Sequence, residues 1–125
     1  MEWTVVKKIS TPDFDIEAGA AKIGEDILLY IQGGDKPHIG CTVMAVPRLS
    51  LSGNGERSVT SSVLNLTGHK DESICRTFAE RMCQACGKTV VCTGGFHLEN
   101  ITPQQIKEVL VAKEKLEKLL LEELR

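Results

Sequence analysis

The chain has 125 residues, a mass of 13.7 kDa and a formal net charge of −2; 42% of its residues are hydrophobic and 26% are charged. This length and composition are typical of one soluble globular domain, so we expect a single domain spanning residues 1–125. The slightly negative charge and the scarcity of aromatic residues argue against nucleic-acid binding, which usually needs a basic surface and stacking side chains.

The sequence also argues against a membrane protein. No apolar run reaches the roughly 18 residues that a membrane helix needs, and the N-terminus lacks the basic and apolar regions of a signal peptide. The five cysteines are an odd number without the spacing of a disulfide framework, which favours reduced thiols in a reducing compartment. We therefore expect a cytoplasmic protein with no membrane partner.

The first half of the chain predicts strands. Runs rich in β-branched and apolar residues occupy residues 3–9, 14–22, 27–32, 41–48 and 57–66. Turn signals separate them, and the strongest is Ser52-Gly53-Asn54-Gly55. The pattern therefore predicts a five-strand antiparallel meander.

The second half changes to a helical period. Apolar residues recur at Ile74, Phe78 and Met82, which predicts an amphipathic helix over 71–86 that ends before Gly87. A short buried strand follows at 88–93. A long helix then begins at Thr102, with Pro103 at its first position and Gln105 three residues after the cap, and runs to the C-terminus. The fold class is therefore α+β, with the helices packed on one sheet face.

Each of the three histidines lies just beyond glycine, at the end of a strand-like run. The functional interpretation is that His38, His69 and His97 converge on one ligand at one end of the sheet. The alternative is that each imidazole only hydrogen-bonds a nearby carbonyl. A metal such as zinc is possible, since neutral imidazole is a common ligand, but we do not expect one because the spacing does not force two histidines together.

The same loops are suited to a phosphate. Backbone N–H groups in glycine-rich loops, and the N-terminus of a following helix, bind anions. Lysines at 36 and 70 add positive charge. No nucleophile pairs visibly with a base, so we assign no catalytic residue. The candidate cofactor-binding residues are Gly33, Gly34, Lys36, Pro37, His38, His69, Lys70, Gly94, Gly95 and His97.

Two further patterns favour structural roles. Cys83 and Cys86 form a Cys-x-x-Cys pair in the last turn of the first helix, where the helix dipole disfavours a thiolate. The thiols nearest the loops, Cys41 and Cys92, lie in apolar strand runs where burial raises the pKa of a thiol.

The leucine-rich C-terminal helix packs either into the core or against a second copy in a homodimer, and the sequence leaves both interpretations open.

Three motifs together resemble a known family. They are Gly-Gly-x-x-Pro-His-Ile-Gly at 33–40, His-Lys-Asp-Glu at 69–72 and Gly-Gly-Phe-His-Leu-Glu-Asn-Ile-Thr at 94–102. The chain from about residue 14 to 110 resembles the small accessory subunit of hydroxyarylic acid decarboxylases such as gallate or 4-hydroxybenzoate decarboxylase. This family is also known as a prenylated-flavin chaperone-like domain. The order of elements is similar to the small proteasome-assembly-chaperone fold.

The resemblance implies a cytoplasmic, non-catalytic accessory protein. Such a protein would bind, mature or deliver prenylated flavin mononucleotide (FMN) for a partner decarboxylase. The alternative is a small histidine-dependent hydrolase or lyase, with or without a metal. The resemblance implies no catalytic residues, so we assign none in this chain on its basis.

Overall fold

The computed structural model describes residues 1–51, 53, 55–66 and 70–124. In chain order its elements are β1 (Trp3–Ser10), β2 (Asp15–Ile23), β3 (Asp26–Gly34), β4 (Cys41–Leu49), β5 (Arg57–Asn65), α1 (Lys70–Cys86), β6 (Val90–His97) and α2 (Pro103–Leu124). The first five strands and both helices begin and end within two residues of their predicted positions. The predicted turn at 52–55 lies partly outside the described residues, but β4 and β5 pair antiparallel on either side of it.

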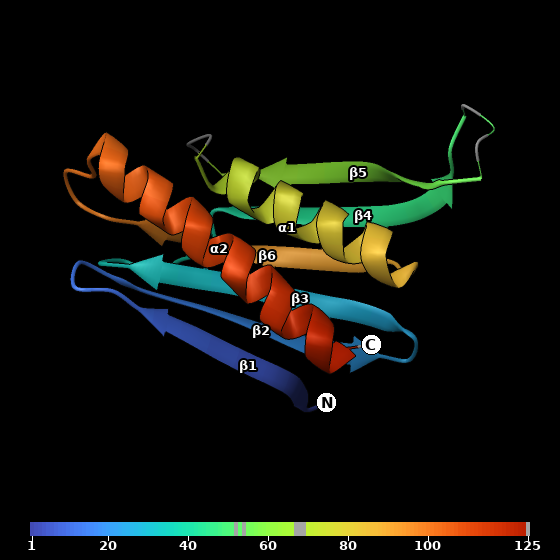
Figure 1. The fold of residues 1–125 in the computed structure, drawn as a ribbon, viewed down its shortest axis with the longest axis horizontal. Coiled ribbons are helices and arrows are strands. Elements are labelled where there is room, and N and C mark those ends of the chain that lie inside the picture. Colours follow the sequence, from blue (N-terminus) through green and yellow to red (C-terminus); the bar gives the residue numbers. More distant parts are fainter. Residues whose placement is uncertain (52, 54, 67–69, 125) are drawn as a thin grey trace.

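The strand order corrects one prediction. The six strands form one sheet in the order β1-β2-β3-β6-β4-β5, so β3 and β4 are not neighbours (Figure 1). Instead β6 lies between them, parallel to β3 and antiparallel to β4. The predicted antiparallel meander was therefore wrong in its centre, and the sheet is mixed. The α+β class and the order helix, strand, long helix are confirmed.

Both helices cover the same face of the sheet (Figure 1). Residues of β3 alternate between buried and half-buried, which is the pattern of a strand whose two faces meet different surroundings. The largest fully buried side chains of the helices are Phe78 and Met82 of α1 and Leu116 and Leu120 of α2. Two of the C-terminal leucines thus serve the chain's own core and are not available for a dimer seam. We call the uncovered side of the sheet the open face.

The predicted helix ends are confirmed. Gly87 has φ = 68° and its N–H donates to the Cys83 carbonyl at 2.8 Å, which ends α1 in the left-handed conformation. At the start of α2, Thr102 N–H donates to Gln105 Oε1 and Gln105 N–H donates to Thr102 Oγ1, the two bonds of a capping box. No helix in the described part of the chain combines the length and the apolar character that crossing a membrane requires.

A buried polar cluster that the sequence did not reveal joins the two helices. Lys113 and Glu117 of α2 are both nearly inaccessible to solvent, with Nζ and Oε1 3.1 Å apart. Lys113 also donates to the Thr77 hydroxyl of α1 at 2.6 Å, and Arg81 of α1 pairs with Glu117. Because a buried charge without partners is very unfavourable, these contacts fix how α2 lies across α1.

Candidate functional site

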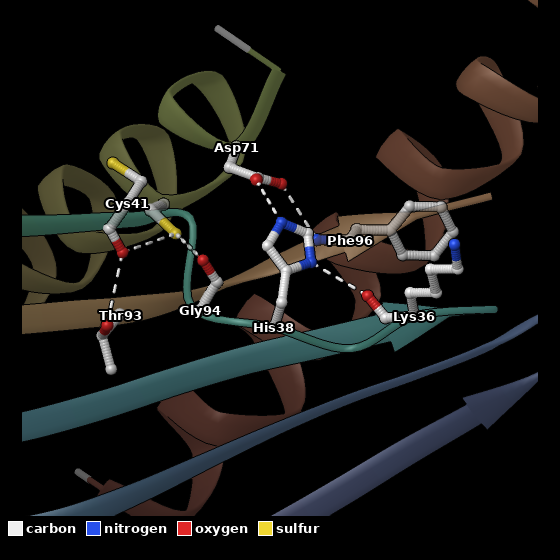
Figure 2. A network of polar contacts seen from close by, with 8 residues as sticks. Lys36, His38, Cys41, Asp71, Thr93, Gly94 and Phe96 are labelled. Carbon is white, nitrogen blue, oxygen red and sulfur yellow. Dashed lines mark hydrogen bonds and ion pairs between the residues drawn. The ribbon is translucent and has the colours of Figure 1, made fainter. Parts of the chain in front are cut away.

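Three segments that are distant in sequence meet at one end of the sheet. Because β3 and β6 are parallel, their last residues, Gly34 and His97, lie side by side in register. The connection 35–40 then crosses the end of β6 to reach β4, which begins at this same end. The first turn of α1 lies above that crossing (Figure 2).

His38 joins these segments through both nitrogens of its ring (Figure 2). Its Nδ1 lies 2.9 Å from the Lys36 carbonyl oxygen, and its Nε2 lies 2.8 Å from Asp71 Oδ2. A backbone carbonyl and a carboxylate are both acceptors, so this arrangement favours the ring form in which both nitrogens donate, the positively charged imidazolium. The bond to the Lys36 carbonyl, together with the Asp71 carboxylate, raises the pKa of His38 above its ordinary value of 6.5.

Asp71 is the second residue of α1 and is almost fully buried. Its Oδ1 accepts a hydrogen bond from the Phe96 N–H of β6 at 2.9 Å, while its Oδ2 faces His38. The positive end of the α1 dipole adds to the stabilisation of the carboxylate. A single side chain therefore ties the helix to the central strand and to the loop 35–40.

Two glycines, Gly40 and Gly95, leave room for the contact between His38 and Asp71. A Cβ on Gly40 would lie 2.1 Å from Asp71 Oδ2, and a Cβ on Gly95 would lie 2.8 Å from His38 Nε2. Both distances are shorter than an ordinary non-bonded carbon contact. These two glycines are therefore needed because the histidine and the carboxylate pass close to the backbone, and not only because a turn is required.

The thiols beneath the site are structural. The Cys75 thiol of α1 lies 3.9 Å from the Cys41 carbonyl and 3.8 Å from the Gly94 carbonyl, and is fully buried. Burial raises the pKa of the Cys41 thiol to about 12, and the neighbouring Cys75 thiol together with burial raises the pKa of Cys92. Cys83 is buried and Cys86 half-buried in the last turn of α1, and none of the five cysteines is in a disulfide. The predicted structural role of these cysteines agrees with their burial.

A cavity of about 330 Å³ lies on the open face beside the loop 35–40. Its lining combines aromatic rings, an amide, a hydroxyl and the His38 imidazolium; the residues are Trp3, Tyr30, Gln32, Pro37, His38 and Thr93. The Trp3 and Tyr30 rings pack edge to face with centroids 4.8 Å apart. Burial and the Glu17 carboxylate that accepts its hydrogen bond raise the pKa of Tyr30 to about 12, so its hydroxyl stays neutral. This lining suits a planar heteroaromatic ring with polar edges.

A second cavity, of about 230 Å³, lies on the helix-covered side of the same end. It is formed by the start of α1, the end of β6 and the first turns of α2. Its walls are almost entirely apolar, with Ser73 and His97 as polar members; the apolar residues include Ile74, Phe96, Leu98, Ile101 and Ile106. It suits an aliphatic group and offers little to orient a polar ring.

The structure brings most of the predicted site residues to this end of the sheet. Gly33 and Gly34 end β3, and Lys36, Pro37 and His38 follow in the loop. The glycines at 94 and 95 lie inside β6, so the prediction that they form a loop after the strand was wrong. His69 lies outside the described residues, and Lys70 is the first residue of α1.

The two described histidines line different cavities. His38 borders the open-face cavity, whereas His97 borders the helix-side cavity and places its Nε2 3.1 Å from Glu99 Oε2. Within the described ranges, no three histidine, cysteine or acidic side chains come together in a way that could hold a metal ion. A general base must accept a proton, whereas both ring nitrogens of His38 face acceptors. This arrangement does not favour His38 as a general base.

Sequence reasoning missed five residues of the site. The role of Asp71 could not be predicted, because its partner His38 is 33 positions away in the sequence. The other four, Trp3, Tyr30, Gln32 and Thr93, come from three strands whose pairing order was predicted incorrectly or only in part. No local spacing signals these residues, because their proximity depends on β6 lying beside β3.

The ion pair predicts a pH dependence of stability. Because folded His38 binds its proton more tightly than the unfolded chain does, the pair stabilises the fold below the ordinary histidine pKa. This contribution is lost as the pH rises through the raised pKa of the folded state. We expect an NMR titration to place the pKa of the His38 ring above 6.5, and His38→Gln to flatten the pH dependence of the free energy of unfolding. His97→Gln is the control, and a His38 ring that titrates below 6.5 would contradict the account.

Comparisons with known proteins agree with this architecture. A solved structure described as a novel chaperone complex for yeast 20S proteasome assembly is similar with a TM-score of 0.57, over 99% of this chain and 98% of that chain. At 19% sequence identity this likeness establishes the fold alone. None of the curated proteins matches the sequence. The family model of the prenylated flavin chaperone LpdD-like domain matches residues 10–125, so the chain belongs to the family of prenylated flavin chaperone LpdD-like domains.

Proposed function

We propose that this protein binds prenylated FMN and matures or delivers it for a hydroxyarylic acid decarboxylase. The observation that carries the proposal is the open-face cavity, where aromatic rings, polar groups and an imidazolium surround a space of about 330 Å³. A flavin offers a flat ring with a polar edge, an apolar prenyl-derived part and an anionic phosphate. Membership of the prenylated flavin chaperone family supports the choice of this flavin over other planar ligands.

The loop and its neighbours are the proposed binding residues. The flavin ring would lie against Trp3 and Tyr30, with Gln32 and Thr93 available to its polar edge. The phosphate would lie toward the loop end of the cavity. There Pro37 and His38 line the cavity. The full set of binding residues proposed from the sequence, of which His97 borders the helix-side cavity instead, is Gly33, Gly34, Lys36, Pro37, His38, His69, Lys70, Gly94, Gly95 and His97.

The proposed role is non-catalytic. The reaction would belong to the partner decarboxylase, and this chain, acting as a single domain in the cytoplasm, would hold the cofactor. The alternative of a histidine-dependent hydrolase or lyase gains no support from the geometry, because His38 is held as a hydrogen-bond donor at both ring nitrogens. The buried thiols with raised pKa values are equally poor nucleophiles.

Two assays test the proposal together. A titration with prenylated FMN is expected to show saturable binding that is about tenfold tighter than binding of FMN, because the prenyl carbons bury additional apolar surface. Adding the protein to a prenylated-flavin-dependent decarboxylase is expected to raise its turnover, while the protein alone turns over nothing. The absence of both effects, together with hydrolysis of a small substrate that His97→Ala abolishes, would favour the enzyme.

A further inference from the structure

The open face carries an uncharged, partly apolar centre. One row across the three central strands consists of Leu28, Val91 and Met44, which are in register on β3, β6 and β4. Met44 is 47% exposed, although a methionine at the centre of a sheet is usually covered. The neighbouring positions on this face are also uncharged; they are Tyr30, Gln32, Thr42, Val46 and Thr93.

The charged groups of this face lie around the apolar row, and one of them, the Glu17 carboxylate, accepts hydrogen bonds from Tyr30 and Gln32 beside it. Lys8 lies on the edge strand β1, Glu17 lies on β2 next to β3, and Arg48 lies at the far end of β4, where it donates to the Thr60 hydroxyl of β5. An uncharged centre that contains Met and Tyr, with a charged rim, is the composition of a protein interface rather than of an ordinary solvated surface.

The strand sequences give an independent reason to expect a cover. A strand with one solvated face alternates between apolar and polar residues, whereas a strand covered on both faces is apolar throughout. The run Ile27-Leu28-Leu29-Tyr30-Ile31 in β3 is continuously apolar, and Val90-Val91-Cys92 in β6 is as well. Sheets built of parallel strands are covered on both faces, whereas the helices cover only one side of the parallel pair β3 and β6 (Figure 1).

We propose that a second copy of this chain covers the open face, so that two sheets pack face to face with the helices outside. The geometry is favourable because aligned sheets pack through apolar side chains about 10 Å apart. Six strands of eight or nine residues present a face of roughly 29 Å by 27 Å, a projected area of about 780 Å². That area is close to the roughly 800 Å² per partner of a stable interface. An uncharged centre is compatible with itself across a two-fold axis, so both copies can use the same face.

The dimer does not depend on the flavin proposal, but it extends it. The open-face cavity lies on the same face as the apolar row, toward the end where the loop 35–40 rises. A second copy centred on Leu28, Val91 and Met44 would therefore stand beside the cavity as an additional wall. On this account the complete flavin site contains residues of both copies.

The first test is the mass of the full chain in solution. At roughly 100 µM, above the micromolar dissociation constants of weak interfaces of this size, light scattering is expected to show a dimer. Met44→Asp is expected to make it a monomer with an unchanged circular dichroism spectrum. The matched control is Val111→Asp, which puts the same charge on an exposed valine of α2 and is expected to remain dimeric.

A second readout needs no substitution. Met44 is expected to react with hydrogen peroxide about tenfold more slowly in the dimer than after dilution to the monomer, because oxidation follows exposure. Met1, 80% exposed, and the fully buried Met82 are internal references for fast and slow oxidation. If Met44→Asp does not fold, this measurement decides the question.

Three results would overturn the proposal. A wild-type monomer at about 100 µM, the highest concentration in the series, would exclude the dimer. A dimer in which Met44 reacts as fast as Met1 would place the interface elsewhere, with α2 as the next surface to examine. A monomer whose Met44→Asp variant loses its effect on the decarboxylase would assign the open face to that enzyme. A dimer that binds no flavin would instead refute the proposed function and leave this inference standing.

Discussion

Gly94→Ala is expected to lower the free energy of unfolding by about 3 kcal/mol or more, which is the largest single-residue effect we expect. Gly94 has φ = 145°, and a Cβ at this position would lie 1.7 Å from the Ile31 carbonyl oxygen. That oxygen belongs to the backbone of the neighbouring strand, which the sheet hydrogen bonds hold in place. The clash cannot be relieved by rotating a side chain, so the β3–β6 pairing itself must shift.

The matched control is Gly24→Ala. Gly24 also has a positive φ, 60°, but a Cβ there meets nothing within 4 Å. Gly24→Ala should therefore lower the free energy of unfolding by only about 1 kcal/mol, because alanine is less favourable than glycine at a positive φ. Urea unfolding followed by circular dichroism measures both variants. Equal losses would show that the parallel pairing of β3 with β6 leaves room for a side chain at Gly94.

Asp71→Ala is expected to lower the free energy of unfolding by about 2–4 kcal/mol. The substitution leaves the buried Phe96 N–H without its acceptor and the His38 imidazolium without its counter-ion. Asp71→Asn is expected to cost less, because an amide oxygen can still accept from Phe96. In both variants the pKa of His38 should fall toward its ordinary value, which the NMR titration measures directly.

Asp35→Ala is the control for this prediction. Asp35 also accepts a hydrogen bond from a backbone N–H at the same end of the molecule, that of Glu99 at 3.0 Å, but it is exposed to solvent. Its loss should cost about 1 kcal/mol or less. If Asp35→Ala and Asp71→Ala proved equally destabilising, the ion pair with His38 would not be the contact that joins α1 to the loop.

The sequence predicted the elements well and the centre of the sheet poorly. Local signals placed the strands, the Gly87 helix stop and the capping box of Thr102 and Gln105, because each depends on residues within a few positions. The position of β6 depends on pairing with β3, which lies far earlier in the chain. A clue was present in the continuously apolar run of β3, which is more typical of a central strand covered on both faces than of a member of a one-sided meander.

The sequence predicted the region of the candidate site but not the contacts within it. The glycines at 33, 34, 94 and 95 pointed correctly to the end of the sheet, but they were interpreted as anion-binding loops. In the structure Gly95 makes room for His38, and Gly94 makes room for the Ile31 carbonyl. The contact of His38 with Asp71 requires the crossing of β6 by the loop 35–40, and no spacing in the sequence specifies that crossing.

The central claim is that prenylated FMN binds in the open-face cavity, and Trp3 provides the measurement. Trp3 is the single tryptophan of the sequence and lines this cavity, so its fluorescence should be quenched saturably as the flavin binds. Ile39→Glu puts a negative charge at the rim of the open-face cavity, and Ile106→Glu does the same at the helix-side cavity. We expect Ile39→Glu to weaken binding of the anionic flavin about tenfold and Ile106→Glu to leave it unchanged. Binding that leaves Trp3 unquenched, or that Ile106→Glu weakens while Ile39→Glu does not, would contradict the account.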